Sequence, residues 1–240
     1  MANNAFTRLV IEGKKENIEK IYKEFIKLVD ISGPDAKSEF GNMDACCLLN
    51  IVARAWSIEP RTYEYLDLQN KLRCYFDIPP REDEEGSMGD IHVNSFVKAV
   101  DNEIFAIDNE NYYFVVRTWD RWNATYALYK ILQDIFEVTI YFITEETGMC
   151  IFITNDADQK YFKERIFIQV EDSERTDELR LDTEYYAETL EELLSYYQVQ
   201  SKEELVAKYT VNCCEEYSIM SIDELINTMI RYGEDTHNDR

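Results

Sequence analysis

Two patterns of apolar and polar residues follow each other at the start of the chain. From Phe6 to Glu12, apolar and polar side chains alternate and β-forming residues are frequent, which predicts a strand that ends at Gly13. From Lys15 to Val29, apolar side chains recur at helical spacing, which predicts an amphipathic helix. The chain therefore opens with a strand that leads directly into a helix.

A second group of patterns lies in the middle of the chain. Residues 103–107 and 112–119 have the composition of strands and flank an Asp-Asn-Glu-Asn turn, which predicts a β-hairpin. Asn123 can cap the helix that follows, whose apolar side chains lie on one face. This face consists of Leu128, Ile131, Leu132 and Ile135. Further strands are predicted at residues 137–144, 149–154 and 165–170.

This order of elements predicts an α+β fold with a ferredoxin-like core. A strand, a helix, a hairpin, a helix and a strand give the βαββαβ order of a split βαβ sandwich, and the later strands would extend its sheet. Residues 31–102 interrupt this order with two weaker helical patterns and an acidic loop at 82–89, so we expect a helical insertion there. The ferredoxin-like domain is expected to cover residues 1–170.

The last part of the chain has a different character. From residue 171 to the end it contains 19 acidic and 6 basic residues. Three segments repeat a Ser/Thr-x-x-Glu pattern, in which the hydroxyl and the glutamate can cap the start of a helix. They lie at residues 189–192, 201–204 and 221–224. We therefore expect residues 171–240 to form an acidic helical extension.

Two stretches of the sequence resemble the YubB-type ferredoxin-like proteins of plasmids and phages. These stretches are Asn3 to Gly13, with a helix directly after it, and Thr118-Trp119 with the strand at 138–142 and Glu145 to Met149. Asn4 stands where the family usually has Trp, and no proline follows Trp119. The resemblance implies a ferredoxin-like fold and an origin in a mobile element, and it implies no catalytic activity.

Composition and charge narrow the possible partners. Aromatic residues make up 13% of the chain, which argues for a folded protein, and the net charge is −23. A field of this sign repels nucleic acid and anionic membranes, so direct binding to either is not expected. The chain has no apolar run of membrane-spanning length and no apolar signal core at its start, so we expect a cytoplasmic protein.

The sequence contains no recognisable catalytic or metal-binding motif. Its six cysteines include two adjacent pairs without the two-residue gap typical of zinc sites, and we interpret them as reduced structural thiols. A Ser or Cys nucleophile would have to use His92, but no nucleophile signature surrounds the cysteines. Asp156 and Asp158 suggest the start of a calcium loop, but the following ligand positions carry unsuitable residues. We therefore expect a protein that is not an enzyme and that holds neither a metal nor a cofactor.

One aromatic group could form a binding platform. Trp119, Trp122 and Tyr126 are close in sequence and could stack a base or line a pocket. The alternative is a hydrophobic seam at the start of the second helix. We favour the seam, because the sequence shows no basic rim around these residues.

Three classes of function remain. The first is a binding protein whose acidic face engages a basic partner, as a nucleic-acid mimic that inhibits a nucleic-acid-handling or defence protein. The second is a small-molecule or nucleotide pocket near the sheet, and in the third the acidity serves solubility alone. We favour the first, because a strong field speeds capture of a basic partner. The capping glutamates serve the helices, so the acids free to meet a partner are Glu188, Glu191, Glu203, Glu215, Glu216 and Asp223.

Overall fold

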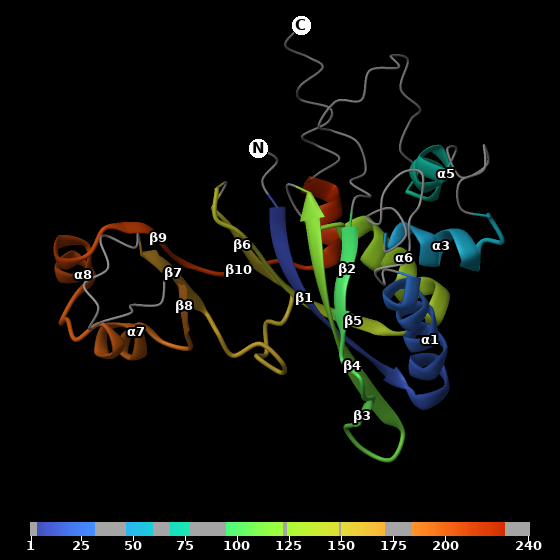
Figure 1. Ribbon diagram of the computed structural model, residues 1–240, viewed down its shortest axis with the longest axis horizontal. Coiled ribbons are helices and arrows are strands. Elements are labelled where there is room, and N and C mark those ends of the chain that lie inside the picture. Colours follow the sequence, from blue (N-terminus) through green and yellow to red (C-terminus); the bar gives the residue numbers. More distant parts are fainter. Residues whose placement is uncertain are drawn as a thin grey trace, which may run out of the picture.

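The computed structural model describes residues 4–31, 47–59, 68–76, 95–121, 124–148, 150–170 and 184–228. These residues form a mixed α+β protein with a seven-stranded mixed sheet, a three-stranded antiparallel sheet and several helices (Figure 1). The α+β class predicted from the sequence is therefore confirmed. No helix in the described ranges is both long enough and apolar enough to cross a membrane.

The larger sheet is built around β1 (Asn4–Lys14). Its neighbours β4 (Asn111–Arg121) and β5 (Thr139–Glu146) both run antiparallel to it. The strand order is β10-β6-β5-β1-β4-β2, with β3 paired to β4 beside this path, and β10 runs parallel to β6. The outer strands are β2 (Ser95–Val100), β3 (Phe105–Ala106), β6 (Ile151–Thr154) and β10 (Ser218–Ile219).

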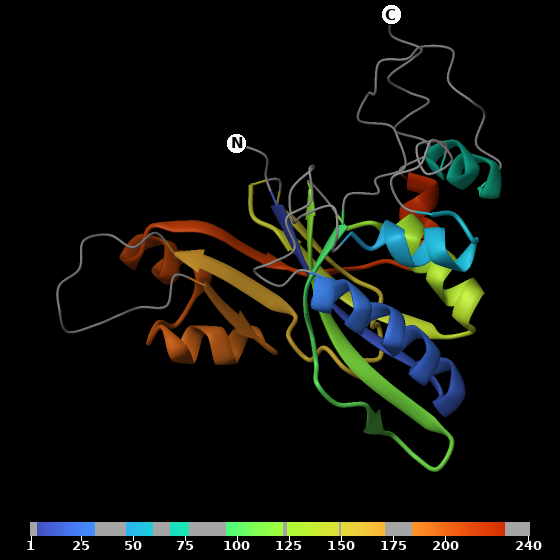
Figure 2. The ribbon, with the colours of Figure 1, turned by 45° about the vertical axis from the view of Figure 1, so that its right-hand side comes forward.

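Helices cover one face of the larger sheet, and the main hydrophobic core lies between them and the strands (Figure 2). The helical spacing of apolar residues in α1 (Lys15–Ile31) places Ile18, Ile21 and Phe25 in this core, where all three are fully buried. The stripe predicted for α6 (Tyr126–Phe136) packs into the same core. The other contributions come from α3 (Leu49–Ala55), α5 (Leu68–Tyr75) and the helical residues 222–228.

A second unit, which we call the small lobe, consists of residues 166–170 and 184–216. Its strands pair antiparallel in the order β8-β7-β9, and Ile168 and Val170 of β7 pack with Leu193 and Leu205 of two short helices. The elements are β7 (Ile166–Val170), β8 (Glu184–Ala187), α7 (Leu190–Tyr196), α8 (Lys202–Lys208) and β9 (Val211–Glu216). The other described residues form what we call the main lobe.

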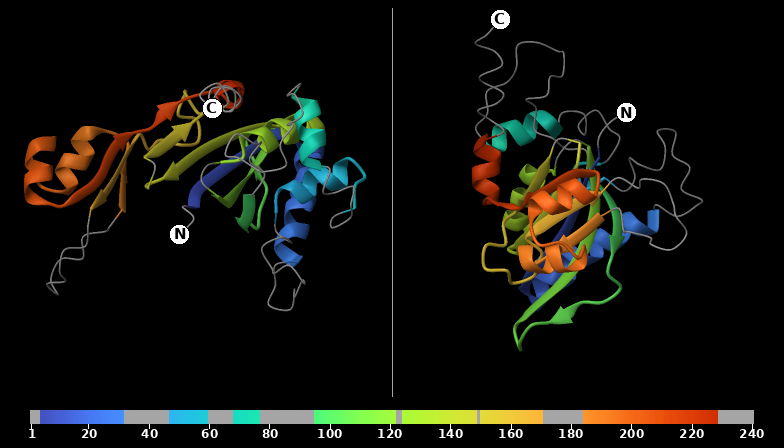
Figure 3. Two further views of the ribbon diagram at one scale, coloured as in Figure 1. Left: turned by 90° about the horizontal axis from the view of Figure 1, so that it is seen from above. Right: turned by 90° about the vertical axis from the view of Figure 1, so that its left-hand side faces the viewer.

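The two lobes meet on the face of the larger sheet that the helices leave open. Along β1 the side chains alternate, so that Leu9 and Ile11 join the core under the helices while Val10 packs in a cluster with Phe167 of β7 and with Tyr217. Figure 3 shows the helices on one side of the larger sheet and the small lobe on the other. The larger sheet is therefore buried on both faces where the lobes join.

One strand of the larger sheet lies elsewhere than the sequence predicted. The hairpin strand expected at 103–107 is reduced to the two residues of β3, and the strand that flanks β4 is mainly β2. β2 lies inside the range 31–102 that we interpreted as an insertion. Its first three residues are all buried, so it lacks the alternation that marks a strand with one exposed face.

The acidic extension predicted from residue 171 onward is not purely helical. Its described part contains β8, β9 and β10 as well as α7, α8 and the helical residues 222–228. β8 and β9 pair with β7, so the small sheet spans the boundary predicted at residue 170. The backbone N–H and C=O groups on both edges of β7 need hydrogen-bond partners, and β8 and β9 supply them. A local helix-capping pattern does not reveal such pairing.

Two predicted structural features lie outside the described ranges. These are the helix cap at Asn123 and the acidic loop at 82–89. The helix α6 itself begins at Tyr126, after Thr125, whose side chain makes no capping hydrogen bond.

Candidate functional site

Five of the six acidic residues predicted to meet a partner lie on the small lobe. Glu188, Glu191, Glu203, Glu215 and Glu216 are all exposed there. Asp223 lies apart from them, on the helical residues 222–228 that pack against the main core, and its carboxylate is 3.8 Å from Nζ of Lys130. The structure thus groups five of these acids in one lobe and separates the sixth.

Glu215 and Glu216 lie on a strand, whereas the sequence pattern placed them among helices. They stand at the end of β9, opposite Phe167 and Ile166 of β7. β9 is an edge strand of the small sheet, so one side of its backbone has no strand partner among the described residues. Only Val211 of this strand belongs to the residue types enriched in strands, so the strand depends on its pairing with the apolar strand β7.

The capping glutamates serve the helices, as the sequence predicted. The hydroxyls of Thr189, Ser201 and Ser221 each accept a hydrogen bond of 3.2 Å from the backbone N–H three residues later. The carboxylate of Glu224 accepts from the N–H of Ser221, and this bond holds the pKa of Glu224 below its usual value. In α7 and α8 the reciprocal bond reaches one residue further back, to the N–H of Glu188 and of Gln200.

Two of the three aromatic residues of the predicted platform, Trp119 and Tyr126, lie on different faces of the larger sheet. Tyr126, the first residue of α6, is fully buried in the main core, with its ring centroid 5.2 Å from that of Phe142. Trp119 lies on the face of β4 opposite to this core, because side chains alternate along the strand. There the Trp119 ring meets Phe6 edge-on, and Nζ of Lys98 lies 3.3 Å from its centroid. Trp122 lies outside the described residues. Since Lys98 occupies one face of the Trp119 indole, that face is not open for stacking a base.

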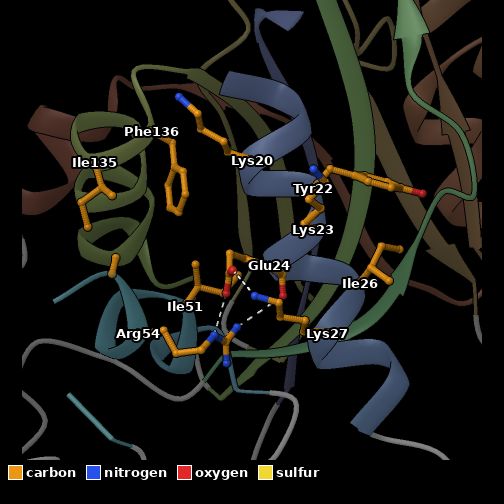
Figure 4. Close-up of a pocket in the computed structure, with 11 residues that line it drawn as sticks. Lys20, Tyr22, Lys23, Glu24, Ile26, Lys27, Ile51, Arg54, Ile135 and Phe136 are labelled. Atoms are coloured by element: carbon orange, nitrogen blue, oxygen red, sulfur yellow. Dashed lines mark hydrogen bonds and ion pairs between the residues drawn. The ribbon is translucent and has the colours of Figure 1, made fainter. Parts of the chain in front are cut away.

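A groove of about 780 Å³ lies between α1, α3 and α6 (Figure 4). Glu24 of α1 lies in this groove and joins Nζ of Lys27 at 2.5 Å to Nε of Arg54 at 2.6 Å. Burial alone would raise the pKa of Glu24, but hydrogen bonds from Lys27 and Arg54 outweigh it and hold the pKa below its usual value. The cations along the groove are Lys20, Lys23, Lys27 and Arg54, and its apolar wall includes Ile51, Ile135 and Phe136.

Sequence reasoning missed this groove because its residues come from three helices that are distant in sequence. One local signal was available. Lys20, Lys23 and Lys27 have the i, i+3, i+7 spacing that places side chains on one face of a helix. In a chain with 48 acidic and 25 basic residues, such a row of three lysines could have indicated a local basic surface.

A buried polar cluster lies under the helices at one end of the larger sheet. The carboxylate of Asp120 is fully buried and accepts hydrogen bonds from the hydroxyls of Thr7 at 2.8 Å and Thr118 at 3.0 Å. Burial raises the pKa of Asp120 to about 6, although nearby hydroxyls, including those of Ser95 and Tyr129, oppose the rise. Neither Ser95 nor Tyr129 reaches Asp120 with the geometry of a full hydrogen bond, and Oδ1 of Asp120 has no partner among the described residues.

Comparisons with protein-family models, with curated proteins and with solved structures found no match to this chain.

Asp156 and Cys213, which were considered as ligand or nucleophile candidates from the sequence, have structural roles. Asp156 accepts hydrogen bonds from the backbone N–H groups of Lys160, Tyr161 and Phe162, so its carboxylate shapes the loop before β7. Burial raises the pKa of the Cys213 thiol to about 12, which keeps this thiol protonated and unreactive. No group of three or more His, Cys, Asp and Glu side chains suited to a metal ion occurs in the described ranges. His92 lies outside them.

Proposed function

We propose that the protein is a non-enzymatic binding protein that engages a basic protein through its small lobe. Between residues 184 and 216 the chain carries eight acidic and two basic residues, and all eight acidic side chains are exposed. This concentration of exposed acids on a lobe with its own core is the observation that carries the proposal. An acidic surface of this kind accelerates encounter with a basic partner and disfavours other partners.

We infer that the partner is a protein that normally handles nucleic acid, such as a host defence protein. This chain would then act as an inhibitor of that partner. A site that binds phosphates with Lys and Arg is the kind of basic surface that exposed carboxylates complement. The net charge of −23 disfavours direct binding of nucleic acid to this chain. This chain and the nucleic acid would therefore compete for the same basic site on the partner.

We also propose a finer description of the fold. The antiparallel order β5-β1-β4-β2, with α1 after β1 and α6 after β4, supports a ferredoxin-like split βαβ core. The helices α3 and α5 would then belong to an insertion, and the small lobe to a C-terminal extension. The resemblance to YubB-type proteins supports an origin in a phage or plasmid, and the expected reduced thiols suit the cytoplasm.

Capture of the partner tests this function. The immobilised full chain should retain a small set of basic proteins from an extract of the cells in which it occurs, and added duplex DNA or RNA should release them. The variant E215K/E216K should retain less of each, whereas E16K/E19K, with the same charge change on exposed residues of α1, should behave like the parent. Equal retention by all three chains, insensitive to nucleic acid, would contradict the proposal.

A further inference from the structure

The groove between α1, α3 and α6 differs in charge from the rest of the molecule. It carries four cationic side chains and one carboxylate, that of Glu24, in a protein whose net charge is −23. Lys27 and Arg54 already share Glu24, as Figure 4 shows. Lys20 and Lys23 make no ion pair with any residue that the structure describes. The groove therefore holds two ammonium groups that an anionic ligand could contact directly.

The opposite wall of the groove is apolar. Ile135 and Phe136, at the end of α6, are only partly buried and line the groove beside Ile51 of α3. A partly exposed aromatic ring and a partly exposed isoleucine favour a flat or apolar ligand body over a fully hydrated one. A ligand that satisfies both walls must combine an anionic group with an apolar ring.

We propose that this groove binds a nucleotide, with its phosphates on Lys20 and Lys23 and its base against Ile135 and Phe136. The volume of about 780 Å³ lies within the range of small-molecule sites. Lysine is a common phosphate ligand, and Arg54 can turn from Glu24 to a phosphate because both offer it oxygen acceptors. Glu24 is thus an internal competitor of the ligand. This site is independent of the acidic small lobe, so either proposal can fail without the other.

Isothermal titration calorimetry of the full chain with three probes tests the ligand class. ADP carries both the phosphates and the base, adenosine lacks the phosphates, and pyrophosphate lacks the base. ADP should bind at least about tenfold more tightly than either other probe, because each wall contributes separately. Equal affinity for pyrophosphate would reduce the groove to a simple anion site, equal affinity for adenosine would remove the role of the lysines, and no binding of ADP would overturn the proposal outright.

Four variants locate the site. K20Q/K23Q should weaken ADP binding by at least about tenfold, because two charge-assisted contacts are lost. K14Q/K163Q removes two exposed lysines outside the groove and should leave ADP binding within about twofold, since exposed charges at a distance are screened. E24Q should tighten ADP binding, whereas E19Q, with the same charge change on the same helix, should not. If K14Q/K163Q weakens binding as much as K20Q/K23Q, ADP binds elsewhere and the proposal is wrong.

Discussion

Asp120 places a carboxyl group where its charged form is poorly solvated. Its pKa rises from 3.8 to about 6 because burial outweighs the hydrogen bonds from Thr7 and Thr118. A carboxyl whose pKa is higher in the folded than in the unfolded state stabilises the fold at pH values below its pKa in the unfolded chain. That contribution is lost as the pH rises through the folded pKa, so the relevant window runs from about pH 4 to pH 6.

The variant Asp120→Asn tests whether the pKa of Asp120 is raised in the folded protein. An amide does not titrate, so the free energy of unfolding of the parent, relative to the variant, should fall by about 2 kcal/mol between pH 4 and pH 7. Urea unfolding of both proteins at several pH values measures the difference. Asp158→Asn, at an exposed position, serves as the control and should show no comparable change. A parent-to-D120N difference that stays constant with pH would show that Asp120 keeps an ordinary pKa in the fold.

Strongly periodic elements could be predicted from the sequence, and elements defined by their neighbours could not. β1 and α1 follow the expected ranges closely because their apolar residues recur with the periods of a strand and a helix. β2 was missed because it is buried on both sides at its start, and β9 because it forms only as a partner of β7. Local signals do not report pairing between strands that are distant in sequence.

The candidate sites follow the same rule. The helix caps at Thr189, Ser201 and Ser221 were predictable, because the Ser/Thr-x-x-Glu pattern that marks each one spans only four residues. The exposed acids of the small lobe were also identified in advance, although Glu215 and Glu216 proved to lie on a strand. The basic groove could not be assembled from the sequence, since it requires the packing of α1, α3 and α6.

The side chain of Thr189 caps the start of α7 and should stabilise this helix. Thr189→Ala removes the hydroxyl that accepts from the N–H of Glu192, and it should lower the free energy of unfolding by about 1 kcal/mol. Ser195→Ala changes an exposed hydroxyl near the other end of the same helix and should have no destabilising effect. Urea unfolding of the three proteins provides the comparison. Equal stability of T189A and the parent would mean that water replaces the cap at no cost.

The molecule as a whole has an uneven charge distribution. The small lobe carries an excess of exposed carboxylates, while the groove of the main lobe gathers four cations. The lobes are joined by apolar packing and by the partly buried carboxylate of Glu145, which accepts a hydrogen bond from Tyr186 of the small lobe at 2.7 Å and another from Tyr217 at 2.9 Å. This junction connects the acidic small lobe to the main lobe through both apolar and hydrogen-bonded contacts.

The rate of association with the captured partner, measured at increasing salt, tests the acidic small lobe most directly. At low salt E215K/E216K should associate at least about tenfold more slowly than the parent while unfolding at nearly the same urea concentration, because exposed charges contribute little to stability, typically under about 1 kcal/mol each. At high salt the two rates should converge, since charges are screened beyond about 8 Å already at physiological ionic strength. E16K/E19K should follow the parent throughout. If E215K/E216K associates as fast as the parent at low salt, the acidic surface of the small lobe does not bind the partner.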